Sequence, residues 1–263
     1  MRVRLADIDV GYTRMGEGPS AVMVHGLAED RSSWADVQRR LSDFTTYAYD
    51  LRGHGETDLG EAEGTLEQLG GDLIAFLEAL TGPADCIGYS LGGTVVLWVA
   101  ARRPDLVTRA TVAGTSAVVG RRAVGFFHDR VETLQSDFPA FAGLLKEDTR
   151  QQLAVAGDQL EEVAARRLKA VGTGGGYVNA ARAMAKLNEE PLTQMLPGIT
   201  CPVHVIGGEA DAFCPRKAAD IMMAALRCGT YREVARAGHL MSVDRPDAYA
   251  QAIRNALESS ARW

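Results

Sequence analysis

Two patterns of hydrophobic positions alternate along the first part of the chain. Short runs that are almost entirely apolar, such as residues 20–24, are followed by segments whose apolar residues recur every three or four positions, such as 65–80. The first pattern is typical of strands buried on both faces, and the second of helices that pack one face against a core. Repeated strand–helix alternation predicts an α/β protein with a mostly parallel sheet covered by helices.

The pattern places most of the elements individually. Residues 2–15 alternate apolar and polar positions and predict an antiparallel hairpin at a sheet edge. Thr65 and Gln68 have the spacing of a helix-capping box. Further strands are expected at 20–24, 45–49, up to Ile87, 106–114, 203–206 and 230–235. Further helices are expected at about 31–42, 65–80, 94–101, 216–227 and 246–258.

The alternation stops between residues 118 and 196. This segment contains no convincing strand, but it has amphipathic helical patterns at about 121–136, 138–155, 158–171 and 177–188. We therefore expect a helical cap, 118–196, inserted into a core formed by 1–117 and 197–263.

Composition narrows the class of protein. The 263 residues, 46% of them hydrophobic, are enough for one large α/β domain with an insertion. A net charge of −6 without a basic run argues against a nucleic-acid or anionic-membrane partner. We find no stretch of transmembrane length and no apolar leader, so a soluble cytoplasmic protein is expected, as a monomer or homodimer. The four cysteines form no C-x-x-C pair, so a zinc site is not expected. We expect no cofactor.

The hexapeptide Gly88-Tyr89-Ser90-Leu91-Gly92-Gly93 lies between a predicted strand and a predicted helix. In a Gly-x-Ser-x-Gly turn the serine is strained, and the flanking glycines let the strand and helix backbones approach closely. The turn holds the hydroxyl above the sheet edge, at the N-terminus of the helix. Ser90 is therefore the candidate nucleophile.

A serine nucleophile needs a base, and the base needs an orienting carboxylate. His239 follows the last predicted strand, and Asp211 follows the strand at 203–206. The chain order serine, acid, histidine is the one expected with this turn motif, and strand ends meet at one edge of the sheet. We expect Ser90, Asp211 and His239 to form the catalytic triad, with Asp50 and Glu209 as alternative acids.

An oxyanion intermediate needs two N–H donors. The amide of Leu91, directly after the nucleophile, is expected to supply one, and Leu27, in the loop after the early buried strand, the other, with Ala28 as the alternative. His25 is expected mainly to brace that loop. The segment from Asp50 to Gly55 is expected to tie loops together through an Arg–carboxylate pair.

The cap is expected to shape the substrate pocket. Most of its aromatic residues should form its own core, and most of its arginines, Arg121, Arg122, Arg130 and Arg182, should be solvated, although one could bind a substrate carboxylate. The candidate pocket residues are His25, Tyr89, Phe126, Phe127 and Phe141.

These motifs together resemble the α/β-hydrolase superfamily. The resemblance covers almost the whole chain: His25-Gly26, the segment from Asp50 to Gly55, the Ser90 turn, Gly208-Glu209-x-Asp211 and Gly238-His239. It implies an eight-stranded, mostly parallel sheet with helices on both faces and a helical cap after strand six. Members that act on haloalkanes or epoxides carry aspartate at the position of Ser90. The general pattern is similar to the carboxylesterase and 3-oxoadipate enol-lactonase-like branch.

The sequence thus predicts a serine hydrolase that cleaves a small ester, lactone or thioester through an acyl-enzyme. Two alternatives remain open. The same triad could serve carbon–carbon bond hydrolysis, perhydrolysis or a lyase step, or the protein could be a ligand receptor with vestigial turnover.

Overall fold

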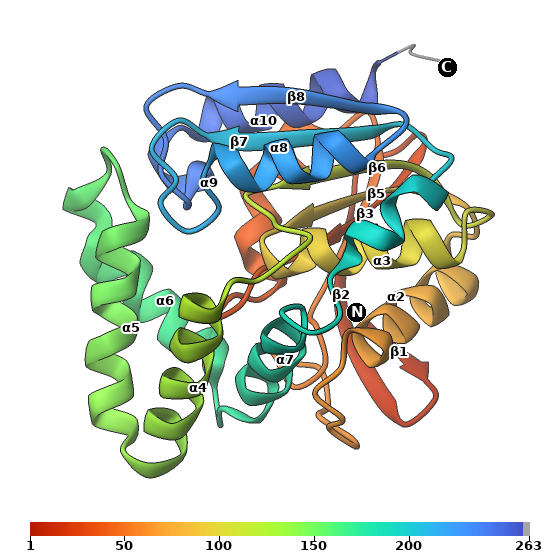
Figure 1. Ribbon diagram of the computed structural model, residues 1–263. Coiled ribbons are helices and arrows are strands. Elements are labelled where there is room, and N and C mark those ends of the chain that lie inside the picture. Colours follow the sequence, from red (N-terminus) through yellow and green to blue (C-terminus); the bar gives the residue numbers. More distant parts are fainter. Residues whose placement is uncertain (260–263) are drawn as a thin grey trace.

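The computed structural model describes residues 1–259, so residues 260–263 of the expected core lie outside the described part. Eight strands form one sheet in the order β1-β2-β4-β3-β5-β6-β7-β8 (Figure 1). β1 and β2 pair antiparallel, as do β2 and β4, and every other pair is parallel. The strands are β1 (Arg2–Leu5), β2 (Ile8–Met15), β3 (Ser20–Val24), β4 (Thr45–Tyr49), β5 (Ala84–Tyr89), β6 (Val107–Ala113), β7 (Val203–Gly208) and β8 (Gly229–Val234).

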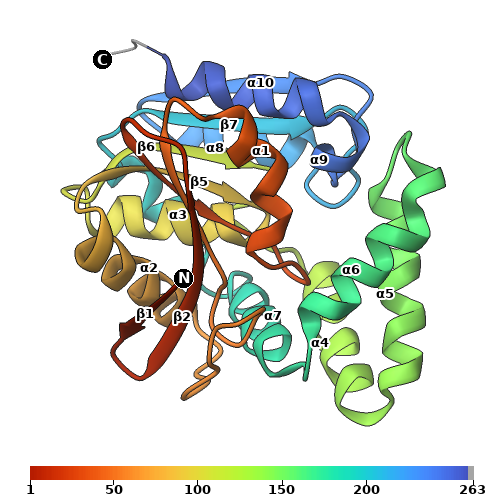
Figure 2. The ribbon, with the colours of Figure 1, turned by 180° about the vertical axis from the view of Figure 1, so that it is seen from behind.

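Helices cover both faces of this sheet (Figures 1 and 2). α1 and α10 lie on one face, and α2, α3 and α8 on the other. The core helices are α1 (Ala35–Arg40), α2 (Leu66–Leu80), α3 (Leu91–Arg102), α8 (Arg216–Ala225), α9 (Met241–Asp244) and α10 (Pro246–Leu257). The α/β-hydrolase fold expected from the sequence is confirmed.

The helical insertion follows β6, as predicted. Four helices, α4 (Arg121–Ser136), α5 (Phe138–Gln152), α6 (Leu160–Val171) and α7 (Gly175–Lys186), lie between β6 and β7 in the chain. In Figure 1 they gather at the side toward which β7 and β8 run. This placement puts the cap, α4–α7, beside the carboxyl ends of the parallel strands, where sites in α/β sheets form. Single-turn 3₁₀ helices, η1 (Arg31–Trp34), η2 (Gly157–Gln159), η3 (Leu192–Gln194) and η4 (Leu196–Gly198), join the larger elements.

Apolar side chains explain why these layers hold together. One buried cluster, containing Phe76 and Leu97, packs α2 and α3 against the sheet. A second, containing Trp34 and Ile253, packs α1 and α10 against the other face. The cap has its own cluster, which includes Phe141. Burial of apolar surface stabilises each layer by about 25 cal/mol per Å².

Local signals set several helix ends. Thr65 caps α2, because its hydroxyl accepts a hydrogen bond from the Gln68 amide at 3.1 Å. Asp137 caps α5 in the same way through the Ala140 amide at 3.0 Å. The short helix α9 is absent from the predicted elements, since four residues are too few to show a helical period.

Candidate active site

Ser90 lies at the junction of β5 and α3, with backbone angles φ 51° and ψ −118°. This positive φ is uncommon for a residue with a side chain. The flanking glycines are required by close packing. A Cβ on Gly88 would lie 2.4 Å from the Gly92 carbonyl oxygen, and one on Gly92 would lie 2.2 Å from that of Val24. The Gly-x-Ser-x-Gly spacing thus follows from the tight contact of β5, α3 and β3.

Hydrogen bonds hold the strained turn in place. The Ser90 amide donates to the Ala113 carbonyl at 2.8 Å. The Thr115 hydroxyl donates to the Ser90 carbonyl at 2.6 Å, and the hydroxyls of Thr94 and Thr115 are 3.1 Å apart. Thr94 and Thr115 are absent from the sequence-based candidates, since no motif marks them.

A chain of hydrogen bonds joins the three candidate triad residues. His239 Nε2 lies 3.1 Å from Ser90 Oγ, and His239 Nδ1 lies 2.8 Å from Asp211 Oδ2. Asp211 and His239 are buried, whereas Ser90 is partly exposed. These residues come from the loops after β7, β8 and β5, which meet at one sheet edge. The arrangement can remove a proton from a serine hydroxyl that substrate can reach.

The surroundings of Asp211 favour its ionised form. Burial by itself would raise the pKa of the Asp211 carboxyl. The interaction with His239 and the hydrogen bonds from two backbone amides outweigh burial, so this pKa lies below that of an ordinary aspartate. Those amides belong to Phe213 and Cys214, which donate to Asp211 Oδ1 at 2.9 and 2.8 Å. One oxygen is therefore fixed by the backbone while the other accepts from the histidine.

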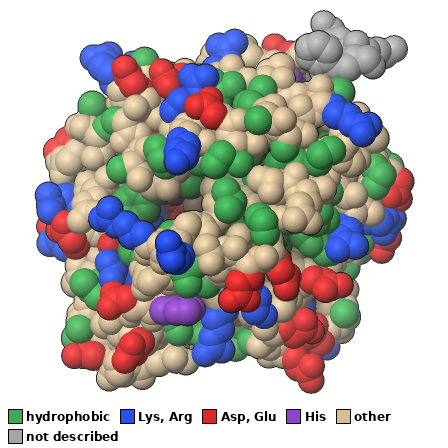
Figure 3. Space-filling view, in the orientation of Figure 1, with side chains coloured by type: hydrophobic (Ala, Val, Ile, Leu, Met, Phe, Trp, Pro, Cys, Tyr) green, Lys and Arg blue, Asp and Glu red, His purple; other side chains and the backbone are tan. Residues whose placement is uncertain are grey.

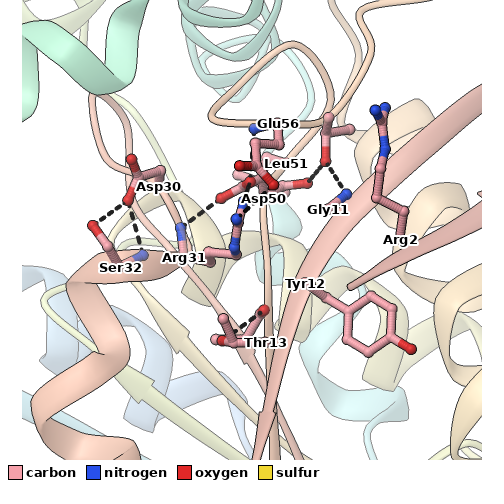
Figure 4. A network of polar contacts seen from close by, with 12 residues as sticks. Arg2, Gly11, Tyr12, Thr13, Asp30, Arg31, Ser32, Asp50, Leu51 and Glu56 are labelled. Carbon is pink, nitrogen blue, oxygen red and sulfur yellow. Dashed lines mark hydrogen bonds and ion pairs between the residues drawn. The ribbon is translucent and has the colours of Figure 1, made fainter.

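The two alternative acids serve other loops. Glu209 accepts a hydrogen bond from the Arg236 amide at 2.7 Å. Asp50 accepts from the amides of Arg31 and Glu56 at 2.7 and 2.9 Å, and from the Arg31 guanidinium (Figure 4). The Arg–carboxylate pairing expected for this segment is present: Arg52 also bonds Asp7 and Asp72.

Among residues 1–259, His239 is the one histidine that hydrogen-bonds the Ser90 hydroxyl, and the others have different partners. His25, a candidate pocket residue, is completely buried: Nδ1 lies 2.8 Å from the Gly26 carbonyl, and Nε2 accepts from the Leu51 amide at 2.9 Å. The structure therefore gives His25 a bracing position and corrects its place among the pocket residues. His54 is buried beside it, with ring centroids 5.1 Å apart. His204 contacts Thr230 on the neighbouring strand at 2.7 Å, and His128 is exposed on α4.

Two amides near Ser90 are available for an oxyanion. Within residues 1–259, neither the Leu27 nor the Leu91 N–H donates a hydrogen bond, and Leu91 begins α3, where the helix dipole favours negative charge. Ala28, the alternative donor, has φ 57°, so the loop after β3 also contains a positive φ. The Gly26 amide is not available, because it donates to Glu29 Oε2 at 3.3 Å.

Aromatic side chains border the histidine. The ring of Phe213 lies 5.6 Å from that of His239, and Phe126 of α4 packs edge-on against Phe213 at 6.1 Å. Tyr89 lies on another side of His239, ring centroids 5.2 Å apart, and its hydroxyl donates to the His239 carbonyl at 3.0 Å. Phe213 is missing from the sequence-based candidates, although its position two residues after Asp211 is a signal that could have identified it.

Two other cap aromatics lie elsewhere. Phe141 is completely buried in the cap, edge-on to Tyr177 at 5.1 Å, so its placement in the substrate pocket is corrected. Phe127 lines an outer groove between α4 and α7, together with His128 and Arg182. Helical periodicity could not separate these positions, because the face a cap helix buries depends on the helices beside it.

Asp244 links the cap to the loop that contains His239 through hydrogen bonds. Its carboxylate accepts from the amides of Ala154, Val155 and Ala156 after α5, at 2.9, 2.8 and 2.9 Å, and from the Gly238 amide at 2.8 Å. A single buried carboxylate thus bonds one cap segment and the residue before His239.

Other kinds of site have little support in the described part of the chain. No group of three or more His, Cys, Asp or Glu side chains within residues 1–259 could hold a metal ion. None of the helices there is long and apolar enough to cross a membrane. On the face shown in Figure 3, acidic and basic side chains are interspersed.

The chain as a whole is similar to known proteins. Residues 21–252 match the model of the Alpha/beta hydrolase family. A similar curated protein is 3-oxoadipate enol-lactonase 1 of Acinetobacter baylyi, 26% identical over 246 residues that cover 92% of this chain and 89% of the relative.

Solved structures are also similar over the full length. The enol-lactonase from Burkholderia xenovorans LB400 superimposes with a TM-score of 0.88 at 25% identity, covering 98% of this chain and 100% of that one. A thermophilic esterase from Thermogutta terrifontis, solved with malate bound, gives a TM-score of 0.85 at 26% identity and covers 98% of both chains.

Proposed function

This chain belongs to the alpha/beta hydrolase family, and on that basis we propose that it is a serine hydrolase that cleaves a small ester, lactone or thioester through an acyl-enzyme. The observation that carries the proposal is the continuous hydrogen-bonded path from Ser90 through His239 to Asp211, at 3.1 and 2.8 Å. A ligand receptor would not need an activated nucleophile. The names of the lactonase and esterase relatives support the same reaction class.

The reaction begins with proton transfer. His239 Nε2 accepts the Ser90 proton as Oγ attacks the carbonyl carbon, and the carbonyl electrons move onto oxygen. The Leu91 and Leu27 amides donate to that oxyanion. Asp211 accepts from His239 Nδ1, which keeps Nε2 free to receive the proton and stabilises the imidazolium.

The second half releases the acid. The imidazolium protonates the leaving oxygen or sulfur as its bond to the acyl carbon breaks. His239 then removes a proton from water as the water oxygen attacks the acyl carbon. It returns that proton to Ser90 Oγ as the bond between Oγ and the acyl carbon breaks, which releases the acid. In a lactone the leaving oxygen stays attached to the acyl chain, so the product is a single hydroxy acid; an enol lactone gives an enol acid, which tautomerises to the keto acid.

The test is a parallel activity screen of short acyl esters, lactones and acyl thioesters, with identification of the products. We expect turnover of at least one of these classes by the native protein and none above background by Ser90→Ala. Products in which the bond between the acyl carbon and the leaving oxygen or sulfur is still intact would contradict the proposal. Equal turnover by Ser90→Ala would also contradict it. Products of carbon–carbon cleavage would show that the triad serves that chemistry instead.

A further inference from the structure

The loop that contains His239 is attached to the cap on both sides of the histidine. Leu240, the residue after His239, donates its amide to the Gln152 carbonyl at the end of α5, at 3.1 Å. Gly238, the residue before His239, donates its amide to Asp244, whose carboxylate also binds three cap amides. Both chain neighbours of His239 are thus hydrogen-bonded to the cap, one directly and one through a carboxylate.

Close packing around Gly238 shows that these contacts leave no free space. A Cβ at this position would lie 2.4 Å from the Gln152 carbonyl oxygen and 3.1 Å from the Ala154 amide nitrogen. A Cβ on Gly208, at the end of β7, would lie 2.4 Å from the Gly238 carbonyl oxygen. Gly238 therefore packs tightly against backbone of the cap and of the strand that leads to Asp211, and a shift of one part is transmitted to the others.

The Asp244 carboxylate joins the two sides of this contact. Only 7% of the residue is exposed. Oδ1 accepts from the amides of Val155 and Ala156, and Oδ2 accepts from those of Ala154 and Gly238, all at 2.8 to 2.9 Å. Within the described part of the chain it has no ion-pair partner within 4.0 Å, so the four amides compensate its buried charge.

The backbone of Asp244 belongs to the core. It is the last residue of α9, and its amide donates to the Leu240 carbonyl at 3.0 Å. α10 begins at Pro246, and its residue Ile253 packs against the sheet. Figures 1 and 2 show α9 at the side of the core that faces α5 and α6. The carboxylate is therefore held by the core and reaches out to the cap segment, residues 154–156.

The geometry of His239 depends on how its backbone is held. The Tyr89 hydroxyl and the Met241 amide donate to the His239 carbonyl, at 3.0 and 2.9 Å. Its ring makes the two hydrogen bonds, to Ser90 and Asp211, on which the proposed proton transfer depends. Hydrogen bonds weaken steeply as their geometry departs from the ideal, so a small displacement of the loop would weaken both.

We propose that Asp244 is a positioning residue: by binding Gly238 and the cap segment 154–156 together, it holds the His239 ring within reach of Ser90 and Asp211. The inference rests on the proposed function and adds a role for the cap. The cap supports the histidine in addition to lying beside the strand ends.

Asp244→Asn tests the link with little change in side-chain size. One acceptor oxygen becomes an NH₂ group, which would face two of the four amides whichever way the side chain turns, so the contact between cap and loop is weakened. Asp50→Asn is the matched control. Asp50 is also buried and also accepts hydrogen bonds from two backbone amides, but in a loop that follows a different strand.

A proton NMR signal tests positioning without any substrate. The Nδ1 proton between His239 and Asp211 should give a downfield resonance, identified by its absence from His239→Ala. We expect Asp244→Asn to move this resonance upfield or broaden it beyond detection, because the hydrogen bond lengthens, and Asp50→Asn to leave it in place. A resonance that neither variant alters, or that both alter equally, would overturn the proposal.

The second measurement is the rate at which a fluorophosphonate labels Ser90, which does not depend on the identity of the natural substrate. A displaced histidine should lower this rate constant by about 10- to 100-fold in Asp244→Asn, and Asp50→Asn should lower it much less. Thermal unfolding of both variants is recorded, and labelling is carried out well below both melting temperatures. Equal losses of labelling rate in the two variants would indicate a purely structural role and would contradict the proposal.

The contribution of the cap is tested from the other side of the contact. Ala154→Pro removes one cap amide and places a ring carbon against the Asp244 carboxylate. The preceding Leu153 is already extended, with φ −93° and ψ 134°, as a residue before proline prefers. Ala154→Gly keeps the amide and is the control. We expect the proline variant to alter the His239 resonance and slow labelling, and the glycine variant to do neither. No difference between them would refute the role of the cap.

These outcomes remain separate from those of the proposed function. Absence of ester, lactone and thioester turnover, or failure of Ser90 to react with the fluorophosphonate, would refute the proposed function. The NMR comparison of Asp244→Asn with Asp50→Asn needs only the hydrogen bond between His239 and Asp211. An unchanged resonance in Asp244→Asn would therefore refute this inference whatever the protein hydrolyses.

Discussion

Asp211 and Asp50 show how two buried aspartates that follow different strands of the sheet, β7 and β4, have different partners. Asp211 Oδ2 is within 2.8 Å of His239, whereas Asp50 has both oxygens engaged by Arg31 and Glu56. Sequence order favours Asp211, and its contact with His239 supports that choice. The difference lies in which side chain is within reach of each carboxylate.

This difference predicts opposite effects of two matched substitutions. In Asp211→Asn the retained oxygen can still accept from Phe213 and Cys214, so the melting temperature should change little. The amide placed against His239 Nδ1 would favour the wrong tautomer and lower kcat by up to about 10⁴. Asp50→Asn should instead lower the free energy of unfolding by about 1–3 kcal/mol, because the NH₂ group of the asparagine would face N–H donors of Arg31 or Glu56. Much of the activity should be retained.

Esterase kinetics and thermal unfolding of both variants provide the measurement. A stable, active Asp211→Asn protein together with a folded, inactive Asp50→Asn protein would reassign the acid to Asp50.

Single residues differ in how far the sequence can identify them. Ser90, Asp211 and His239 can be identified from short sequence motifs, because each lies in a turn or loop directly after a predicted strand. Thr115 carries no such motif, because its hydrogen bond to the Ser90 carbonyl joins positions 25 residues apart in the chain. Whether an arginine on an amphipathic helix is solvated or buried is decided by the elements packed against it, and the helical period does not contain that information.

At the scale of elements, the strands and the four cap helices are predictable, because short apolar runs and the helical period of hydrophobic positions distinguish one type of element from the other. The cap attachment is not, since Asp244 bonds backbone amides about 90 positions earlier in the chain. The sequence predicts that His25 braces the loop after β3, but it does not predict the corresponding position of His54 in the loop after β4. The contact of His25 across 26 positions, to the Leu51 amide, depends on the parallel pairing of β3 with β4.

The paired loop histidines predict acid sensitivity. Burial lowers the pKa of His25 to about 4 and that of His54 to about 3. Protonation of His25 would also break its bond from the Leu51 amide. Because the unfolded pKa is about 6.5, the unfolded chain takes up these protons first as the pH falls. Stability should be complete above pH ~6.5 and fall below it, by up to about 1.4 kcal/mol per pH unit for each histidine.

Urea unfolding between about pH 5 and 7, above the range where most carboxylates titrate, measures this slope. His54→Asn should reduce it, because the asparagine amide can replace Nδ1 in donating to the Arg52 carbonyl without taking up a proton. The exposed His128→Asn is the matched control and should leave the slope unchanged. A slope that His54→Asn does not alter would assign the acid sensitivity to other groups.

For the whole molecule, the fold follows from consistent signals at every level. Apolar strands, capped helices and glycine-dependent turns specify the same eight-stranded sheet, and three loops from separate strands deliver Ser90, Asp211 and His239 to one edge. We propose that the substrate, by contrast, is selected by the fit between the cap and the core. That fit is a property of the assembled chain, which is why local motifs indicate a reaction class and do not identify the substrate.

The most direct test of the central claim, that Ser90 is an activated nucleophile, is covalent labelling with a fluorophosphonate, with the modified residue located by peptide mass spectrometry. We predict that the native protein is labelled at Ser90, that Ser90→Ala is not labelled, and that His239→Ala, which lacks the base, reacts at least about 10³-fold more slowly. Labelling at a different residue, or equal labelling of the native protein and Ser90→Ala, would contradict the account.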